Sequence, residues 1–249
     1  MFAKIELKLK CEKEIRHQMA SLFHGVLMEC IDTGYAEYLH RSETHPYSSH
    51  LELRGEEWFW VVSTLNEEAY KYIIEEKLSK LTEFKIENKE MQVQVLEKKI
   101  TKRDSDELEK KFYQENCSRY VELQILTPMS FKQRGRYVFA PDVRLIYQSL
   151  INKYDKISDG EMFDEDTLEY LIEHTFIANY NIRSMNFYME GVKIPGFIGK
   201  LILKINGAQT MVNFGNILFE FGEYSGIGIK SSIGMGAVKI IRKGEKHDG

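Results

Sequence analysis

The sequence predicts an α+β protein of two tandem ferredoxin-like (βαββαβ) domains with a C-terminal glycine-rich loop. Apolar residues that recur with period two indicate strands, and those with period 3.6 indicate helices. Up to about residue 100 these segments follow in the order β, α, β, β, α, β. The same order recurs after residue 116, and a glycine-rich stretch, 226–236, lies between its last helix and last strand. We therefore predict domains over 1–105 and 116–244, joined by a charged connector.

Each element of the first predicted domain has its own signal. Ala3, Ile5, Leu7 and Leu9 alternate with charged residues, which indicates a half-buried strand. Apolar side chains then recur at helical spacing, so we expect an amphipathic helix. This helix is expected over 14–32. The elements expected after it are a short helix through 35–39, a loop to residue 50, strands at 51–53 and 58–63, a helix over 66–81 and a strand at 91–95.

The second predicted domain repeats this order without a detectable sequence repeat. Asp142 is a candidate cap for its first helix. The expected elements are a strand at 120–126, a helix over 142–151, an acidic helix over 159–176, a hairpin of 182–189 and 197–205, a helix over 210–224 and a strand at 237–242.

Composition restricts the class of protein. The 249 residues are 43% hydrophobic, which is enough for one large core or two small ones. The formal net charge is −4, so a nucleic-acid site must be a local patch. Cys11, Cys30 and Cys117 are isolated, which suits a reducing cytoplasm and excludes a cysteine-rich zinc module. Charges begin at Lys4 and no long apolar run follows, so we expect a cytoplasmic protein without a membrane span or cofactor.

The glycine-rich stretch has the composition of an anion-binding loop. It consists of Gly226, Gly228, Gly234 and Gly236 around Lys230, Ser231 and Ser232. A loop that exposes N–H groups, two hydroxyls and a lysine is suited to phosphate. Its order of helix, loop and strand matches neither a Walker loop nor a dinucleotide fingerprint. The alternative is a connection that merely turns the chain.

Four segments together resemble a known family. They are Ser225–Gly236, Tyr38-Leu39-His40 followed by Pro46-Tyr47-Ser48, Leu126–Phe131, and Ile194–Gly199. They resemble the signatures of the CRISPR-associated repeat-RNA-processing endoribonucleases, within the repeat-associated mysterious protein (RAMP) superfamily. The segments run in family order over nearly the whole chain, and the glycine-rich one is the most specific.

The resemblance implies a metal-independent endoribonuclease that cuts CRISPR repeat transcripts into guide RNAs. Its products would carry 2′,3′-cyclic phosphate and 5′-hydroxyl ends. The implied partner is CRISPR repeat RNA, with other subunits of an effector complex or a second copy of the chain as further candidates. The alternative is a non-catalytic guide-RNA-binding subunit, which would keep the fold and the glycine-rich loop without an acid–base pair.

Histidines are the candidate catalytic residues. His40, His45 and His50 are evenly spaced, but no carboxylate or cysteine joins them at metal-ligand intervals, so we expect no metal site. Histidine can instead act as a general acid or base near neutral pH. His40 matches the family's histidine. Its partner is open between His45, in the following loop, and His24, on the first helix.

Some family members pair the histidine with a tyrosine on the first helix and a lysine in the following loop. This set of catalytic residues is incomplete here. The tyrosine position on the first helix falls near Met28, and no lysine occurs between Lys13 and Lys71. A second histidine is therefore a candidate, as in family members that use two. Arg41 and Arg54 are candidates for stabilising the charged phosphorane.

The candidate RNA contacts are basic residues near glycines or on strands. Besides the glycine-rich loop, they are Lys132, Arg134 and Arg136 around Gly135, and Arg183 and Lys200 on the second hairpin. The alternative for each of these side chains is an ordinary solvated surface charge.

Overall fold

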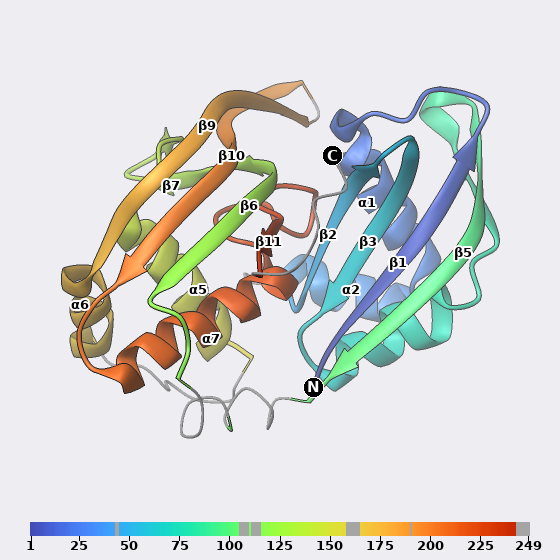
Figure 1. Cartoon of the computed structure of the whole chain (residues 1–249). Helices are drawn as coiled ribbons and strands as arrows, with labels where there is room; N and C mark the ends of the chain where they lie inside the picture. The colour runs from blue at the N-terminus through green and yellow to red at the C-terminus, as the bar shows by residue number, and fades with distance from the viewer. Residues whose placement is uncertain (43–44, 105–109, 111–115, 158–164, 190, 243–249) are drawn as a thin grey trace.

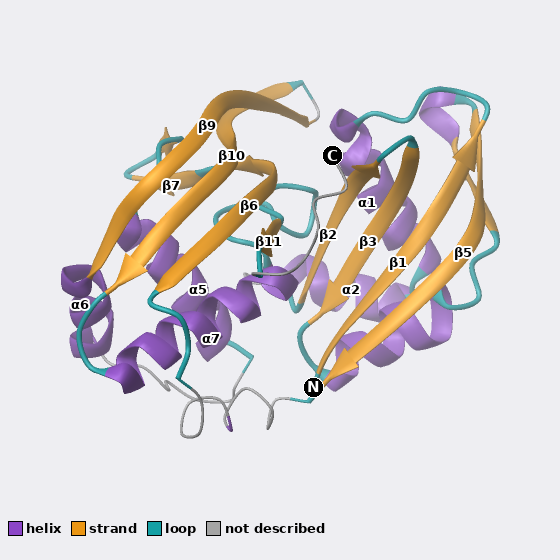
Figure 2. Cartoon of the chain, viewed as in Figure 1, coloured by secondary structure: helices purple, strands orange, loops and turns teal. Residues whose placement is uncertain are grey.

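Two antiparallel β-sheets lie side by side in the computed structural model, and the helices gather behind and below them in the view of Figure 2. The structure describes residues 1–42, 45–104, 110, 116–157, 165–189 and 191–242. No helix within these ranges is both long and apolar enough to span a bilayer. We call the part from β1 to β5 the N-terminal unit and the part from β6 to β11 the C-terminal unit (Figure 1).

The N-terminal unit has a five-stranded sheet in the order β2-β3-β1-β5-β4. Strands β2, β3, β1 and β5 with their helices make the βαββαβ arrangement, and β4 adds an edge strand paired with β5. The elements are β1 (Phe2–Cys11), η1 (His17–Met19), α1 (Ala20–Cys30), α2 (Thr33–Arg41), β2 (Tyr47–Arg54), β3 (Glu57–Thr64), α3 (Glu67–Ala69), the π-helical η2 (Tyr70–Leu78), β4 (Glu83–Ile86), η3 (Glu87–Lys89) and β5 (Met91–Arg103).

The C-terminal unit has a four-stranded sheet in the corresponding order β11-β6-β10-β9, and a small separate hairpin. The elements are β6 (Tyr120–Met129), the hairpin strands β7 (Phe131–Gln133) and β8 (Arg136–Val138), α5 (Val143–Asp155), α6 (Glu165–His174), β9 (Thr175–Met189), β10 (Val192–Ile205), α7 (Gln209–Ser225) and β11 (Val238–Ile240). The predicted fold class is confirmed. The domain limits at 105 and 244 lie outside the described residues and stay predictions.

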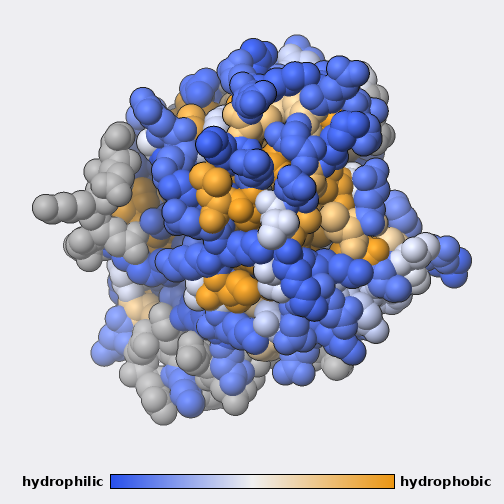
Figure 3. Space-filling view, turned by 90° about the vertical axis from the view of Figure 1, so that its right-hand side faces the viewer, coloured by the Kyte–Doolittle hydropathy of each residue, from blue (hydrophilic) through white to orange (hydrophobic). Residues whose placement is uncertain are grey.

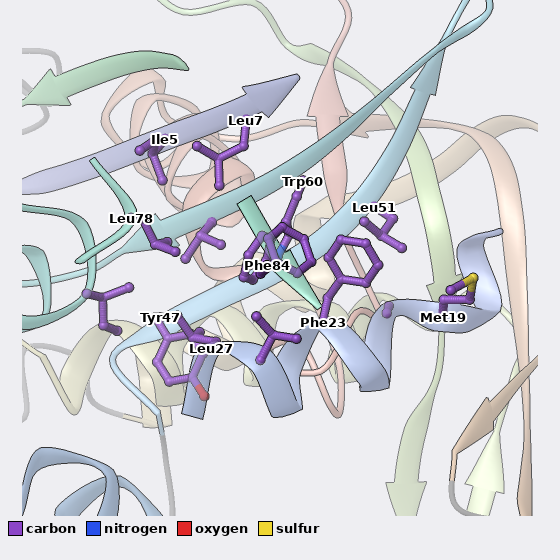
Figure 4. Close-up of a cluster of buried hydrophobic side chains, with 14 of the residues drawn as sticks. Ile5, Leu7, Met19, Phe23, Leu27, Tyr47, Leu51, Trp60, Leu78 and Phe84 are labelled. Carbon is purple, nitrogen blue, oxygen red and sulfur yellow. The ribbon is translucent and has the colours of Figure 1, made fainter. Parts of the chain in front are cut away.

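Periodicity predicted the core of the N-terminal unit correctly. Ile5 and Leu7 on β1 are fully buried. They share a core with Phe23 of α1 and Trp60 of β3 (Figure 4). The Phe23 and Trp60 rings meet edge-on, with centroids 5.3 Å apart. Burial of alternate residues fixes which face of β1 meets the helices.

Strand β2 begins earlier than predicted. We expected a loop up to His50, but β2 starts at Tyr47. Ser48 and Ser49 are buried and bonded: Ser48 Oγ donates to the Tyr224 carbonyl, and Ser49 Oγ accepts from Trp60 Nε1 at 2.8 Å. Polar residues that satisfy tertiary hydrogen bonds do not show the alternation that marks a strand.

Several other elements begin at different residues than predicted or were not predicted at all. Helix α2 starts at Thr33, because the Asp32 side chain accepts from the Tyr35 amide at 3.1 Å and caps it. Gly34 therefore lies inside a helix that we expected to begin after it. Strands β4, β7 and β8 were not predicted, and β9 begins at Thr175, inside the expected acidic helix.

Helix α7 joins the two units. Most of its residues are buried, and it contacts β1, β2 and β3 of the N-terminal unit as well as α5 and β11 of its own. Phe2 of β1 packs on Phe221 with ring centroids 5.6 Å apart. Arg103 of β5 forms an ion pair with Glu220 at 2.8 Å. In Figure 1, α7 runs toward the middle of the molecule and ends where the glycine-rich loop begins.

Figure 3 looks onto the outer side of the N-terminal unit. Figure 3 shows this face as mostly hydrophilic, with separated apolar patches. Single exposed apolar residues such as Leu96 and Ile100 on β5 are normal for a protein surface. Several of the candidate residues meet at the junction of the two units.

Candidate active site and RNA-binding surface

The glycine-rich loop is bonded to the histidine-bearing segment of the N-terminal unit. His45 Nδ1 and Ser232 Oγ are 2.8 Å apart, although 187 positions separate the residues in sequence. The Ser49 amide donates to the Ser231 carbonyl at 3.0 Å. The start of β2 and the middle of the loop are therefore held together by a side-chain and a backbone hydrogen bond.

Tyr47 organises the histidines at this junction. It is 1% exposed and packs in the core beside Leu27 of α1 (Figure 4). Its hydroxyl lies 3.3 Å from His24 Nδ1, and its ring is nearly parallel to the His45 ring at 5.5 Å. Tyr47 therefore sits next to both His24 and His45 and restricts how either ring can turn.

Burial keeps both of these histidines neutral near pH 7. The pKa of His24 is lowered to about 4, chiefly by burial and also by the charges of His45, His40 and Lys230. Burial also lowers the pKa of His45, against a hydrogen bond to the Leu39 backbone that favours its charged form. A neutral imidazole can accept a proton, which suits a general base.

His40 lies in the last turn of α2 and is exposed. Its charge contributes to lowering the pKa of both His24 and His45, so the three histidines share one electrostatic environment. The next residue, Arg41, is also exposed and pairs with Glu37 at 3.7 Å. Such an exposed ion pair is weak, so RNA phosphate can replace its carboxylate.

The glycine-rich loop is closed by its own backbone. The Ile227 amide donates to the Gly236 carbonyl at 2.8 Å. Gly236 has φ +67°, and a Cβ there would lie 1.9 Å from the Ile227 carbonyl oxygen. Gly234, with φ +124°, would place a Cβ 2.4 Å from Cβ of Ala20 in α1. These positions accept only glycine, because a side chain would push apart the loop or the two units.

The expectation that this loop exposes its N–H groups is wrong for three of its amides. The amides of Gly228, Ile229 and Gly236 donate to Ser149 Oγ, the Ser130 carbonyl and the Pro128 carbonyl at 2.8, 3.0 and 3.0 Å. Ser232 is buried, whereas Lys230 is exposed in a left-handed conformation with φ 58°. These three amides are therefore occupied within the protein, and the Lys230 side chain is the exposed cation of the loop.

A basic cavity of about 600 Å³ lies between the loop and α5. Its charged lining consists of four lysines, Lys132, Lys153, Lys156 and Lys230, and His45 also lines it. No carboxylate belongs to its lining within the described part of the chain. A concave surface with one sign of charge attracts polyanions.

The basic hairpin β7–β8 borders this cavity. Lys132 lines it, and Arg134 and Gly135 form the two-residue turn, with φ 49° and 78°. Lys132, Arg134 and Arg136 are all exposed. The bond from the Ile229 amide to Ser130 ties the base of the hairpin to the loop. The structure thus brings these candidates together, and their contact with RNA stays a prediction.

Three of the predicted cationic site residues lie away from the histidines and the basic cavity. Arg54 is at the opposite end of β2 from Tyr47, where its guanidinium bonds to Glu52 at 2.6 Å and to Glu6, so the structure does not bring it to the histidines. Lys200 pairs with Glu122 at 2.6 Å on the sheet of the C-terminal unit. Arg183 lines a separate cavity of about 440 Å³ between the two sheets.

Sequence reasoning missed the roles of Tyr47 and Lys153. Tyr47 was noticed only within a motif, because burial between two histidines leaves no local pattern. Lys153 had a usable signal: it follows Ile146 and Leu150 on the apolar stripe of α5, where a charged residue is unusual. Among the described residues, no group of three or more His, Cys, Asp or Glu side chains could hold a metal ion.

Comparisons with known proteins identify the family of this chain. The profile of the CRISPR-associated endoribonuclease Cas6 family matches residues 123–238. The Cas6 endoribonuclease of Streptococcus thermophilus is 36% identical over 239 residues, which covers 92% of this chain and 95% of the relative. That of Mycobacterium tuberculosis is 33% identical over 219 residues, covering 87% and 70%.

A solved structure of a Cas6 product complex superposes with a TM-score of 0.79 over 97% of this chain and 100% of the other, at 20% identity. At that identity the superposition supports the fold alone. The sequence relatives carry the assignment, since both exceed 30% identity over most of this chain. The chain therefore belongs to the CRISPR-associated endoribonuclease Cas6 family, as its motifs led us to expect.

Proposed function

We propose that this protein cuts CRISPR repeat transcripts into guide RNAs by metal-independent general acid–base catalysis. The family supports an endoribonuclease that processes CRISPR precursor RNA. The observation that supports this mechanism is the contact of His45 with Ser232, which joins three histidines to a lysine-lined cavity. A base takes the proton of a 2′-hydroxyl, the oxygen attacks the adjacent phosphorus, and an acid protonates the departing 5′-oxygen.

His40 and a second histidine would transfer the two protons. We propose His45 as the partner, because it lines the cavity and burial lowers its pKa, which favours the neutral form. Its ring already contacts Ser232 and Leu39, so one of these bonds must exchange for a bond to RNA. His24 is the alternative, since Tyr47 accounts for only one of its ring nitrogens.

Cations would stabilise the charge of the phosphorane and hold the RNA. Lys230 and Lys132 project from two sides of the cavity, and Arg41 follows His40 directly. Arg134 and Arg136 on the hairpin would extend this surface along the RNA backbone. Ser231 and Ser232 act in this proposal through the protein, because their hydroxyls bond Lys153 and His45.

Cleavage of repeat RNA is expected to continue in EDTA, since side chains supply both proton transfers. The products should accept a 5′-phosphate from a kinase directly, as 5′-hydroxyl ends do. A substrate with a 2′-deoxynucleotide at the cut should bind but remain intact. Cleavage that stops in EDTA and returns with magnesium or manganese would show that the mechanism is wrong. Tight binding of the all-ribose RNA without cleavage would favour a binding subunit.

Replacing Lys230 by alanine should weaken RNA binding while leaving chemistry largely intact. Single-turnover cleavage at saturating protein should remain within about tenfold, or about 1.4 kcal/mol in the barrier. The slope of log Kd against log salt should become shallower by roughly 0.7–0.9, as for one lost phosphate contact. Lys80→Ala is the matched control, because it removes an exposed lysine that does not line the cavity. An unchanged Kd in Lys230→Ala would remove this lysine from the site.

Association with other effector subunits or with a second copy of the chain also remains a proposal. Size-exclusion chromatography with light scattering, with and without repeat RNA, would measure it.

A further inference from the structure

The Lys153 side chain is bonded to the last residue of α7 and to the glycine-rich loop. Its Nζ donates to the Ser225 carbonyl at 3.2 Å, the Gly226 carbonyl at 2.9 Å and Ser231 Oγ at 3.0 Å. An ammonium group has three N–H donors, and these three oxygens occupy all of them. Lys153 therefore has no donor left for RNA, although it lines the basic cavity.

The first two bonds fix the end of helix α7. The helix ends at Ser225, and the last carbonyls of a helix have no partner within it. Lys153 satisfies the Ser225 carbonyl and that of the next residue, Gly226, and a cation at this end interacts favourably with the helix dipole. The chain then leaves the helix through Gly226, with φ +65°. Lys153 thus fixes the direction in which the loop departs.

The third bond reaches toward the histidines. Ser231 adjoins Ser232, which contacts His45 Nδ1, and the Ser231 carbonyl accepts from the Ser49 amide. One turn earlier on α5, Ser149 accepts from the Gly228 amide at 2.8 Å. Helix α5 therefore supports the loop at its beginning and at its middle, and the support continues to His45.

We propose that Lys153 is a positioning residue that fixes the glycine-rich loop, so that Ser232 holds His45 and Lys230 projects into the basic cavity. This inference rests on the proposed function for its effect on cleavage, but its effect on the loop is independent of RNA. Burial lowers the pKa of Lys153 to about 7, whereas the three acceptors and the carboxyl end of α7 favour its charged, three-donor form.

The first test measures the loop without RNA. Lys153→Met keeps the length of the side chain and removes its hydrogen bonds, so amide hydrogen exchange over 226–236 should speed up at least tenfold. Exchange in strands β1 and β10 should change little, which distinguishes loosening of the loop from general destabilisation. Equal acceleration throughout the chain, or none in the loop, would overturn the proposal. Ser231→Ala removes one bond only and should give a smaller change at the same place.

The second test measures cleavage and RNA affinity. Lys153→Met should lower the single-turnover rate at saturation by about tenfold or more and also raise Kd. Lys156→Met is the matched control for charge, because it removes a lysine that lines the same cavity just after the end of α5. A rate defect in Lys153→Met no larger than in Lys156→Met would show that only charge matters, and the positioning role would be wrong.

A double-mutant cycle with Ser231→Ala completes the test. If Lys153 acts through Ser231, the double variant should lose clearly less than the product of the two single losses. Independent, multiplicative losses would contradict that path. A wild-type protein that does not cut repeat RNA would refute the proposed function and leave the hydrogen-exchange result to decide the role of Lys153.

Discussion

His40→Ala is expected to lower single-turnover cleavage of repeat RNA by at least about a hundredfold while RNA affinity stays nearly unchanged. A positioned general acid or base typically contributes about 10²–10⁴ in rate. His40 is exposed at the end of α2 and close enough to influence the pKa values of His24 and His45. Removing an exposed side chain should leave folding intact. The measurement is the cleavage rate at saturating protein, with Kd determined on the uncleavable 2′-deoxy substrate.

Two variants control this experiment. His40→Gln keeps a hydrogen-bonding side chain but cannot transfer a proton near neutral pH, so it should be nearly as slow as His40→Ala. His174→Ala removes a histidine that stacks on Tyr170 at 4.0 Å and lies outside the cavity lining, so it should cleave within about twofold of wild type. Cleavage at wild-type rates in His40→Ala would refute the role of His40.

His45→Ala is expected to cause a comparable loss, whereas His24→Ala should be mild. The loss arises because the proposed base is gone, but the substitution also breaks the bond to Ser232. Ser232→Ala separates these effects, since it removes the bond and keeps the imidazole. Its loss should be clearly smaller than that of His45→Ala. The reverse ranking, with His24→Ala slow and His45→Ala mild, would transfer the role to His24.

The pH dependence of the cleavage rate is an independent way to identify the general base. A base acts in its neutral form, so the rate should fall as pH drops through its pKa. Burial lowers the pKa of His45, which places this limb below pH 6.5 in the free protein. For His24 the limb would lie near pH 4. The profile of kcat/KM reports the free protein, and its acid limb should disappear in the variant that lacks the base.

Much of the fold could be predicted because its strands and helices are amphipathic. The alternation in β1 and the apolar pattern of α7 gave elements close to those observed. Prediction failed where polar residues are buried, as at Ser48 and Ser49 in β2. It also failed for hairpin β7–β8, whose Lys132 and Arg136 are exposed and carry no core pattern.

The candidate site could be predicted only as separate pieces. Motif resemblance led to His40 and the glycine-rich loop, and spacing suggested His45 and His24. Their association with Tyr47 and Ser232 depends on contacts between residues far apart in the chain. Arg54 illustrates the limit, because its place in sequence near the histidines did not reveal the Glu6 and Glu52 carboxylates that hold it at the far end of β2.

By itself the sequence determined the order of elements, the buried face of most of them and, through its motifs, the family. The elements and their buried faces follow from periodic patterns within each segment, and the family follows from short motifs. Only the tertiary structure shows that α7 packs against both units, that Lys153 is hydrogen-bonded to the loop, and that Ser232 contacts His45. Hydrogen bonds and ion pairs between distant segments form only after packing has brought them within about 3 Å of each other, and no local pattern encodes that approach.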